Sequence, residues 1–361
     1  MNKTKRVLII AYNDLNKSGV PNVIYQVIKS LNEYCTFDIM IFGNNLYYYD
    51  QLKKEGLNNI NIIKFGNSFH IKETFNYYKK ALKFFENNKY DIVHSFLEYK
   101  SYPFFKAAKK CGIKQRIYHS NINKRKENLI GKIQISFLRK KSIKYSTDLV
   151  GVSKQCCTYA FKSNKYFVIN NPYDDVSYNN YIKNELDDNK LVLTQVATFN
   201  SNKNQLFSLD VINELRKINS NVELKLIGYE TEKGYLNKIN KYIHDNNIED
   251  FVDIIDGSEN IPNHYKTTTF VIIPSKSEGF SLVAIEAQAC GITPFLSNAV
   301  PHDVDPFNNC VYLNLNEGAE YWAKMINSKF EENKNNRFEF PNNSPFAKIN
   351  FTKKLMNLYK I

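Results

Sequence analysis

The chain has 361 residues, of which 43% are hydrophobic and 14% aromatic, so it is not a disordered protein and has room for two domains of about 150 to 200 residues. No segment approaches the roughly 18 uninterrupted apolar residues of a membrane span, and six scattered cysteines without a CxxC pair argue against a zinc site or a disulfide framework. The formal net charge of +13 would attract nucleic acid, an anionic lipid surface or a phosphate-bearing substrate, and charge alone does not choose among them.

The first half of the chain alternates strands with helices. RVLIIAY (6–12) is typical of a buried parallel strand and is too short for a signal-peptide core, so we expect a cytoplasmic protein. A loop with Ser18 and Gly19 follows, and Pro21 falls in the first turn of a predicted helix. Further strands are predicted at 37–43, 60–65, 91–96, 115–120 and 148–153, with helices at 74–88 and 101–112.

The pattern restarts after residues 165–190, a segment rich in Asn and Asp that indicates a domain boundary. Strands are predicted at 190–198, 222–228, 252–257 and 270–274, and helices at 205–218, 235–246, 260–269 and 282–290. The fold class is therefore α/β, with two Rossmann-like βα domains that we expect to face each other across a cleft. The domains are predicted at 1–172 and 173–344, and a helix at about 345–361 is free to pack back on the first domain.

One short stretch, PSKSEGFSLVAIEAQACG (274–291), carries two glutamates around a predicted helix start. Ser281 is a suitable N-cap and Gly291 a suitable stop for the helix. Glu278 and Glu286 can accept hydrogen bonds from sugar hydroxyls on either side of an anion. The anion would be held by the backbone N–H groups of the first helical turn, those of Gly279, Phe280, Ser281 and Leu282. An ordinary surface helix with two solvated glutamates would show the same spacing.

PSKSEGFSLVAIEAQACGITPFLSN closely resembles the signature of retaining glycosyltransferases of the GT-B fold, glycosyltransferase family 4. RVLIIAYNDLNKSGVPNVIYQV, YDIVHSF, RIYHSNIN and TDLVGVSKQ are similar to segments of the family's first domain, and VATFNSNKNQ, VELKLIG and VDIIDG to segments of its second. The resemblance therefore spans nearly the whole chain. The segments RIYHSN, NSNKNQ and SNAVPHDVD resemble those of bacterial enzymes that build capsular polysaccharide or exopolysaccharide.

The resemblance implies a role for each matching residue. Glu286 would bind the ribose of a nucleotide sugar and Glu278 the donor sugar, with the diphosphate held at residues 279–282. Lys203 would stabilise the leaving diphosphate, and His119 would face the donor sugar. Gly19 matches the glycine loop that approaches the phosphates and the acceptor. The implied catalytic residues are His119, Lys203 and Glu278.

Some positions depart from this pattern or have a structural alternative. Thr198 stands where the family usually has an arginine, although the position still counts as substrate-binding, and Ser18–Gly19 replaces a pair of glycines. Taken alone, His119 would be a hydrogen-bonded core residue and Lys203 a solvated lysine; His94 is interpreted as structural. Asp303–Val304–Asp305 spells a metal-binding DxD of another glycosyltransferase fold, but no other ligand cluster is nearby. We expect no metal and no cofactor, because the nucleotide sugar is a substrate.

Residues 124–144 form a basic segment with Glu127 as its one acidic residue. Its basic residues are Lys124, Arg125, Lys126, Lys132, Arg139, Lys140, Lys141 and Lys144, and the apolar residues at helical spacing are Leu129, Ile130, Ile133, Phe137 and Leu138. A basic amphipathic helix of this kind lies on anionic membranes. The alternative is a core-packed helix with a solvated basic face.

These observations predict a retaining hexosyltransferase that moves a sugar from a nucleoside diphosphate sugar, expected to be a UDP-sugar, to a saccharide acceptor. The expected acceptor is lipid-linked, and the expected process is surface polysaccharide synthesis at the inner face of the plasma membrane. A sugar-nucleotide epimerase or hydrolase of the GT-B type is the alternative among enzymes. A basic nucleic-acid-binding protein is the alternative outside them, against which no helix-turn-helix, RRM or zinc-finger pattern is found.

Overall fold

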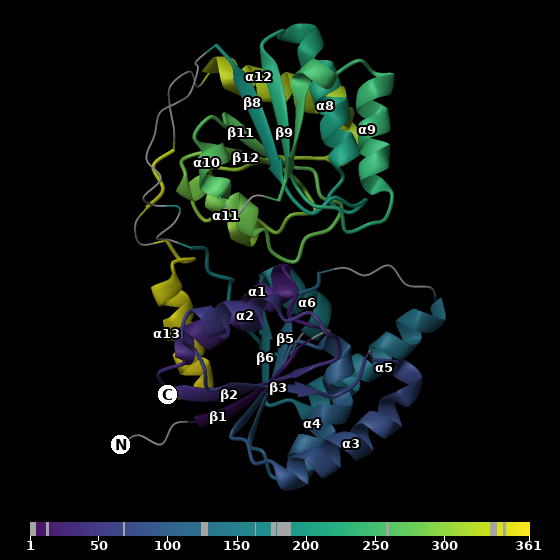
Figure 1. The fold of residues 1–361 in the computed structure, drawn as a ribbon, viewed down its shortest axis with the longest axis vertical. Coiled ribbons are helices and arrows are strands. Elements are labelled where there is room, and N and C mark those ends of the chain that lie inside the picture. The colour runs from purple at the N-terminus through teal and green to yellow at the C-terminus, as the bar shows by residue number, and fades with distance from the viewer. Residues whose placement is uncertain are drawn as a thin grey trace. The chain divides into compact units, whose positions relative to one another are not determined.

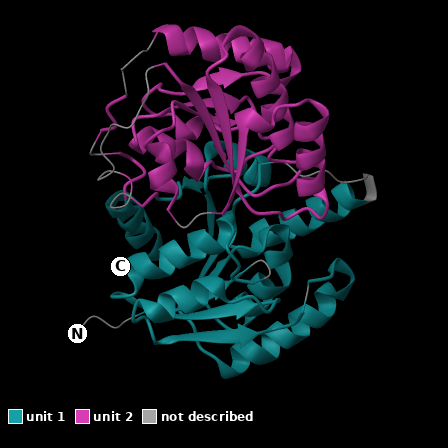
Figure 2. Cartoon of the chain, turned by 45° about the horizontal axis from the view of Figure 1, so that its top comes forward, with its two compact units in different colours: residues 1–172, 348–361 teal, residues 173–347 magenta. Residues whose placement is uncertain are grey.

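The structure is a computed structural model that describes residues 5–11, 14–67, 69–123, 129–162, 164–174, 178, 189–257, 260–332, 338–341 and 344–361. The chain divides into two units (Figure 2): unit 1 is Met1–Pro172 with Lys348–Ile361, and unit 2 is Tyr173–Ala347. Each unit has its own parallel sheet covered by helices on both faces, as Figure 1 shows. The prediction of two Rossmann-like βα units is therefore confirmed.

Among the described residues, unit 1 holds a seven-stranded parallel sheet in the order β3-β2-β1-β4-β5-β6-β7. The strands are β1 (Lys5–Ile10), β2 (Cys35–Ile41), β3 (Ile60–Lys64), β4 (Ile92–Ser95), β5 (Gln115–Ser120), β6 (Asp148–Gly151) and β7 (Phe167–Val168). The strand order reverses direction between β1 and β4, which are hydrogen-bonded neighbours. Ligands of open α/β sheets bind outside the carboxyl ends of the strands at such a point.

The helices of unit 1 cover the two faces of this sheet because successive strand residues point to opposite sides. One face packs on α1 (Gly19–Leu31), α2 (Tyr47–Lys54) and α13 (Lys348–Tyr359). The other packs on α3 (Thr74–Asn87), α4 (Tyr102–Lys110) and α6 (Lys154–Phe161), with α5 (Leu129–Tyr145) against α4. Two short 3₁₀ turns, η1 (Ile71–Glu73) and η2 (Glu98–Ser101), precede α3 and α4.

The C-terminal helix α13 belongs to unit 1 although the chain reaches it only after passing through unit 2. Its buried residues pack with those of α1 on one face of the sheet: Phe351, Leu355, Leu358 and Tyr359. Polar contacts hold its last turn, because Gln115 Nε2 donates to the Leu358 carbonyl at 2.7 Å and Lys5 Nζ to the Lys360 carbonyl at 3.0 Å. This helix therefore completes the hydrophobic core of unit 1.

Among the described residues, unit 2 holds a six-stranded parallel sheet in the order β10-β9-β8-β11-β12-β13. The strands are β8 (Leu191–Val196), β9 (Val222–Gly228), β10 (Val252–Asp256), β11 (Phe270–Ile273), β12 (Thr293–Ser297) and β13 (Val311–Leu313). One face packs on α8 (Gln205–Ile218), α9 (Tyr235–Asp245) and α12 (Gly318–Glu332), the other on α10 (Ile261–Tyr265) and α11 (Leu282–Ala289). Three 3₁₀ turns lie between these elements: η3 (Glu249–Phe251), η4 (His302–Val304) and η5 (Leu315–Glu317).

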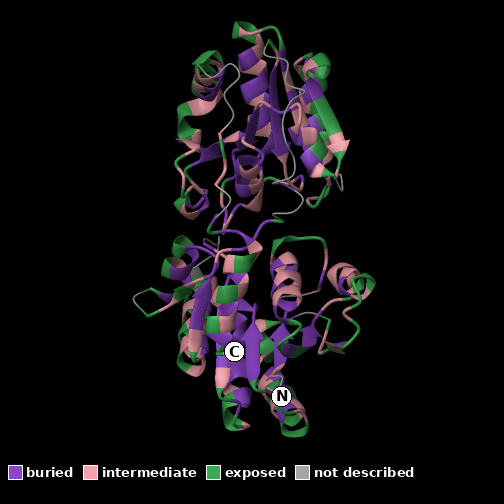
Figure 3. Cartoon of the chain, turned by 90° about the vertical axis from the view of Figure 1, so that its left-hand side faces the viewer, coloured by how far each residue is buried: buried purple, intermediate pink, exposed green. Residues whose placement is uncertain are grey.

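Strands of both sheets are mostly buried, as Figure 3 shows, and this is why they were recognisable as apolar runs. The helix predicted at 205–218 coincides with α8, whereas α2, α6, α12, β12 and β13 were not predicted. Leu52 is the one residue of α2 that is buried, and β12 contains Pro294. Neither segment therefore shows the apolar period by which the other elements were recognised.

We expect Leu355→Ala to lower the free energy of unfolding of unit 1 by about 2 to 5 kcal/mol, because a fully buried leucine leaves a cavity. Lys353→Ala is the matched control on the same helix, since Lys353 is exposed, and its effect should stay within about 0.5 kcal/mol. Urea unfolding followed by circular dichroism measures both. Equal effects of the two substitutions would contradict the packing of α13 on the sheet.

Candidate functional site

The loop from Pro274 to Ser281 joins β11 to α11. Ser281 is the N-cap of α11, and its Oγ accepts a hydrogen bond from the Ala284 N–H at 3.4 Å. Gly291 follows the helix with a φ of +74°, a conformation that glycine adopts without strain. The sequence therefore builds a strand–loop–helix unit in which the backbone N–H groups of the first turn lie just after Glu278.

The structure brings Lys203 and Glu278 together within unit 2. Lys203 Nζ lies 2.5 Å from Glu278 Oε1, and Ser275 Oγ donates to the same oxygen at 2.7 Å. The Glu278 side chain is 9% exposed and that of Lys203 28%, so the pair is shielded from water on the carboxylate side and open on the ammonium side. A partly buried cation beside a helix N-terminus is a favourable place for an anionic group.

Hydrogen bonds fasten the loop after β8 to the loop after β11. Lys276 N donates to the Asn202 carbonyl at 2.8 Å, and Asn202 Nδ2 donates to the Ser277 carbonyl at 3.0 Å. Asn204 Nδ2 adds a bond to the Pro274 carbonyl at 3.1 Å. Because β8 and β11 are adjacent strands, their carboxyl ends place both loops at one edge of the sheet. The Lys203–Glu278 pair is thus positioned by backbone contacts on both sides.

Thr198 lies in the same loop after β8 but is bonded within it. Its carbonyl accepts from Gln205 Nε2 at 3.1 Å, and its Oγ1 accepts from Asn200 Nδ2 at 3.0 Å. The threonine therefore shapes the loop and supplies no positive charge. The close approach of β9 to this region requires a glycine, since a Cβ at Gly228 would lie 1.9 Å from the Ala197 carbonyl oxygen.

Glu286 lies inside α11 and keeps some exposure. Burial raises the pKa of its carboxyl from the ordinary 4.5 to about 7; a hydrogen bond with Tyr178 opposes this rise, and the charge of Asp174 adds to it. Tyr178 itself is buried beside Tyr265, with ring centroids 6.3 Å apart. Tyr178 was not predicted from the sequence, because it lies in the polar segment between the domains, where apolar residues do not recur at helical or strand spacing.

His119 and Gly19 belong to unit 1, where both follow or end strands at the carboxyl side of the sheet. His119 is fully buried, and burial lowers its pKa from 6.5 to about 3, so the ring is neutral at physiological pH. Its Nδ1 lies 3.0 Å from His94 Nε2, while its Nε2 has no partner among the described residues. Gly19 begins α1, and a Cβ there would meet open space.

Glu98 was not predicted as a site residue. It follows β4 in the chain, and its side chain contacts the end of β5. Its carboxylate accepts from Asn121 N at 2.7 Å and Ser120 Oγ at 2.9 Å, and burial raises its pKa to about 7. The backbone of Glu98 has a φ of +55°, unusual for a residue with a side chain. Its position just after the predicted strand DIVHSF, where the ligands of α/β sheets bind, could have indicated it. Glu98 fixes the loop that follows His119.

The DxD segment of Asp303 and Asp305 lies in and after η4. Asp305 Oδ1 accepts the backbone N–H of Asn309 at 2.8 Å and of Cys310 at 3.3 Å, so it stabilises the following turn. Within the described ranges, no group of three or more His, Cys, Asp or Glu side chains is placed to hold a metal ion.

Helix α5 carries the part of the basic segment that the structure describes; Lys124–Lys126 and the side chains of Leu129 and Ile130 lie outside it. The predicted single apolar stripe is wrong in one respect. Leu138 packs inward beside Ile135, whereas Ile133 is 63% and Phe137 57% exposed. The outward face therefore combines two apolar side chains with lysines. In the part of the chain that is described, no helix has the length and apolar character to cross a membrane.

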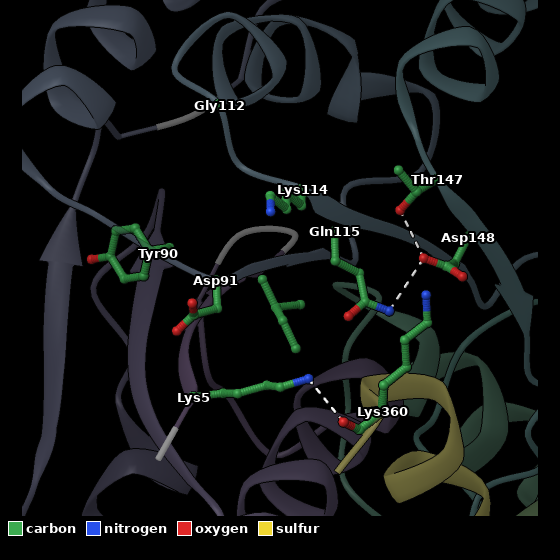
Figure 4. A pocket seen from close by; sticks show the side chains of 10 residues that line it. Lys5, Tyr90, Asp91, Gly112, Lys114, Gln115, Thr147, Asp148 and Lys360 are labelled. Carbon is green, nitrogen blue, oxygen red and sulfur yellow. Dashed lines mark hydrogen bonds between the residues drawn. The ribbon is translucent and has the colours of Figure 1, made fainter. Parts of the chain in front are cut away.

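A cavity of about 570 Å³ opens at the opposite edge of unit 1, at the amino ends of the strands (Figure 4). Its lining comes from the first residues of β1, β5 and β6 and from the chain end, including Lys5, Gln115, Asp148 and Lys360. Within this lining, Gln115 Nε2 and Thr147 Oγ1 both donate to Asp148 Oδ2, at 3.3 and 2.7 Å. None of the predicted site residues lines this cavity.

The chain is similar in sequence and in fold to known glycosyltransferases. Residues 179–336 match the sequence model of the family described as glycosyl transferases group 1. The chain is 24% identical over 355 residues to the capsular polysaccharide biosynthesis glycosyltransferase CapH of Staphylococcus aureus, covering 94% of each chain. It is 22% identical to the putative glycosyltransferase EpsF of Bacillus subtilis over 344 residues, covering 90% of this chain and 88% of that one. The crystal structure of Anabaena HepE with UDP and glucose superposes with a TM-score of 0.75 at 14% identity, covering 99% of both chains.

Glu286→Gln should change how the stability of unit 2 depends on pH. A carboxyl whose folded pKa of about 7 exceeds its ordinary 4.5 contributes its stability fully below about pH 4.5 and loses it as the pH rises through 7. The variant should therefore gain about 2 to 3 kcal/mol relative to the wild type between pH 5 and pH 8, measured by urea unfolding. Asp250→Asn, at an exposed carboxylate of the same unit, is the control. A parallel pH dependence of wild type and Glu286→Gln would contradict the raised pKa.

Proposed function

We propose that this chain is a glycosyltransferase of the GT-B fold that moves a hexose from a UDP-sugar to a saccharide acceptor with retention of configuration; the family-model match, the capsular relative and the shared fold support this. The observation that carries the proposal is the Lys203–Glu278 pair beside the N-terminus of α11. A cation and a row of backbone N–H groups there suit a diphosphate, and the adjacent carboxylate suits sugar hydroxyls.

In this proposal the donor replaces the contact between Lys203 and Glu278. The diphosphate takes the Lys203 ammonium and the N–H groups of residues 279–282, which frees a Glu278 oxygen for the hydroxyls of the sugar. Glu286, eight positions along α11, accepts the two ribose hydroxyls in its ionised form. The presence of UDP and glucose in the HepE complex supports a UDP-sugar as the donor.

The proposed reaction breaks the bond between the anomeric carbon and the phosphate oxygen and forms one from that carbon to the acceptor oxygen. The acceptor proton passes to the departing diphosphate, so no protein nucleophile is required. Lys203 and the helix N-terminus stabilise the negative charge that grows on the diphosphate as the bond breaks. We expect transfer without a metal ion, since these groups supply the positive charge.

The acceptor side of the proposal rests on the relatives and on charge. CapH is a capsular polysaccharide biosynthesis glycosyltransferase, and we propose that this chain also serves surface polysaccharide synthesis. The proposed acceptor is a lipid-linked saccharide, reached at the inner face of the plasma membrane. A net charge of +13 and the exposed Ile133 and Phe137 among the lysines of α5 suit an anionic lipid surface.

Lys203→Ala should weaken UDP binding by about tenfold or more, because a hydrogen bond to a charged group contributes about 1.5 to 3 kcal/mol. Lys276→Ala removes an exposed lysine of the neighbouring loop and should bind UDP within about twofold of the wild type. Isothermal calorimetry with UDP, GDP and ADP measures these affinities and identifies the base. Wild-type affinity for UDP in Lys203→Ala would contradict the proposed diphosphate site.

Replacing Ile133 and Phe137 together by serine should abolish most binding to vesicles of phosphatidylglycerol, a loss of at least tenfold. Each exposed apolar side chain contributes about 1.5 to 3 kcal/mol when it enters the interface. Ile218→Ser, which changes an exposed isoleucine of unit 2, is the control and should sediment like the wild type. Equal sedimentation of the double variant and the wild type, or no preference over phosphatidylcholine, would contradict the membrane role of α5.

A further inference from the structure

Two buried histidines and the last tyrosine of the chain form a hydrogen-bonded row in unit 1. The Tyr359 hydroxyl lies 2.8 Å from His94 Nδ1, and His94 Nε2 lies 3.0 Å from His119 Nδ1. Each of these side chains is fully buried. The row begins on the C-terminal helix α13, crosses β4 and ends at His119 on β5. Of the three, only His119 is a site residue predicted from the sequence.

The geometry of the histidine pair is that of a directed hydrogen bond. The ring planes differ by 9°, and the centroids are 5.2 Å apart while the bonded nitrogens are 3.0 Å apart. These values place the rings edge to edge in nearly one plane, where a nitrogen lone pair points at an N–H. Phe96 packs on both rings, with centroids 4.6 Å from His94 and 4.7 Å from His119, and keeps water from the pair.

The hydrogen bonds of the row can all point toward His119 or all point toward Tyr359. The two arrangements leave different groups without a hydrogen-bond partner. If Tyr359 donates to His94, then His94 donates to His119, and the N–H at His119 Nε2 is the one group of the row left without a partner among the described residues. In the reverse direction the His119 Nε2 lone pair and the Tyr359 O–H are both unmet, since among the described residues that hydroxyl bonds only to His94. An orphaned buried O–H costs about 1 to 3 kcal/mol, so the first direction is favoured.

We propose that Tyr359 and His94 are positioning residues that fix His119 as the neutral tautomer with its proton on Nε2, so that His119 offers a hydrogen-bond donor at the carboxyl edge of the unit 1 sheet. The inference rests on the proposed function for what accepts this hydrogen bond: an oxygen of the saccharide substrate. The unmet Nε2–H is the group that such an oxygen would satisfy.

This tautomer defines what His119 does in the reaction. In this tautomer the lone pair of His119 is on Nδ1 and already accepts a hydrogen bond from His94. No ring nitrogen is therefore left to take a proton from the acceptor hydroxyl. Burial lowers the pKa of His119 to about 3 and also lowers that of His94, so neither ring is a cation near neutral pH. His119 therefore orients a substrate oxygen by donation and leaves the acceptor proton to the diphosphate.

The position of Tyr359 is itself fixed by the strands of unit 1. Lys5 of β1 donates to the Tyr359 and Lys360 carbonyls, and Gln115 of β5 donates to the Leu358 carbonyl at 2.7 Å. The end of the chain is thus tied to the amino edge of the sheet while the tyrosine ring reaches the histidines. A helix remote in sequence from the site thereby sets the proton position on a substrate-facing ring.

Nitrogen NMR of the full chain with ¹⁵N-labelled histidine tests the inference directly. Coupling patterns of a neutral imidazole distinguish the protonated from the unprotonated ring nitrogen, and His119→Asn identifies the His119 signals by their loss. The free wild-type protein should show His119 protonated on Nε2 alone. Protonation on Nδ1, or an equal mixture of the two tautomers, would overturn the inference.

Tyr359→Phe tests the role of the hydroxyl. Without it, both directions of the row leave one donor and one acceptor unmet, so His119 should become a mixture of tautomers. The kcat for UDP release from UDP-glucose should fall about two- to tenfold, with the KM for UDP-glucose little changed. Tyr90→Phe is the matched control, because it removes a buried hydroxyl that donates to Asp38 at 2.6 Å in the same unit. It should leave the His119 tautomer and kcat unchanged.

The two measurements separate this inference from the function on which it rests. A single Nε2–H tautomer in both wild type and Tyr359→Phe would overturn the role of Tyr359, whatever the activity. If the wild type shows the expected tautomer but neither binds nor turns over any UDP-sugar, the proposed function fails while the proton arrangement stands. If Tyr359→Phe does not fold, the wild-type spectrum decides the direction of the row.

Discussion

The ion pair between Lys203 and Glu278 depends on one constraint, the adjacency of β8 and β11 in a parallel sheet. The two residues are 75 positions apart in the chain, and they meet because adjacent parallel strands end at the same edge. The loops that carry them are fastened by hydrogen bonds from the Lys276 N–H and the Asn202 side chain to backbone carbonyls, so the two charges are held in place by the protein itself. Preorganisation of this kind makes a fixed charge effective in stabilising a leaving anion.

The ends of neighbouring parallel strands also bring buried polar groups together in unit 1. His94, Glu98 and His119 are buried at or just after the ends of β4 and β5, and each is held by hydrogen bonds to neighbours on other segments. Burial keeps both histidines uncharged and raises the pKa of Glu98 to about 7. The two neutral histidines at this edge contrast with the charged Lys203–Glu278 pair of unit 2.

Particular residues show which features of the structure could be predicted from the sequence. The N-cap Ser281, the stop at Gly291 and the helix at 205–218 follow from local rules and were found where expected. Helix α5 was expected, but its inward face was not, because Ile133, Phe137 and Leu138 fit one apolar stripe equally well until the position of α4 is known. Tyr178 lies in a polar segment without a period, and its hydrogen bond with Glu286 depends on the packing of that segment on α11.

Local sequence patterns were enough to predict the alternation of strands and helices, the two βα units and the two glutamates around a helix start, because periodic and capping patterns involve residues close together in the chain. The tertiary structure alone decided which charges and protons meet. Tyr359 and His94 are 265 positions apart, and only the docking of α13 on unit 1 joins them. The strand order sets such contacts, and a linear pattern carries no signal for them because the neighbours that satisfy a buried polar group are distant in the chain.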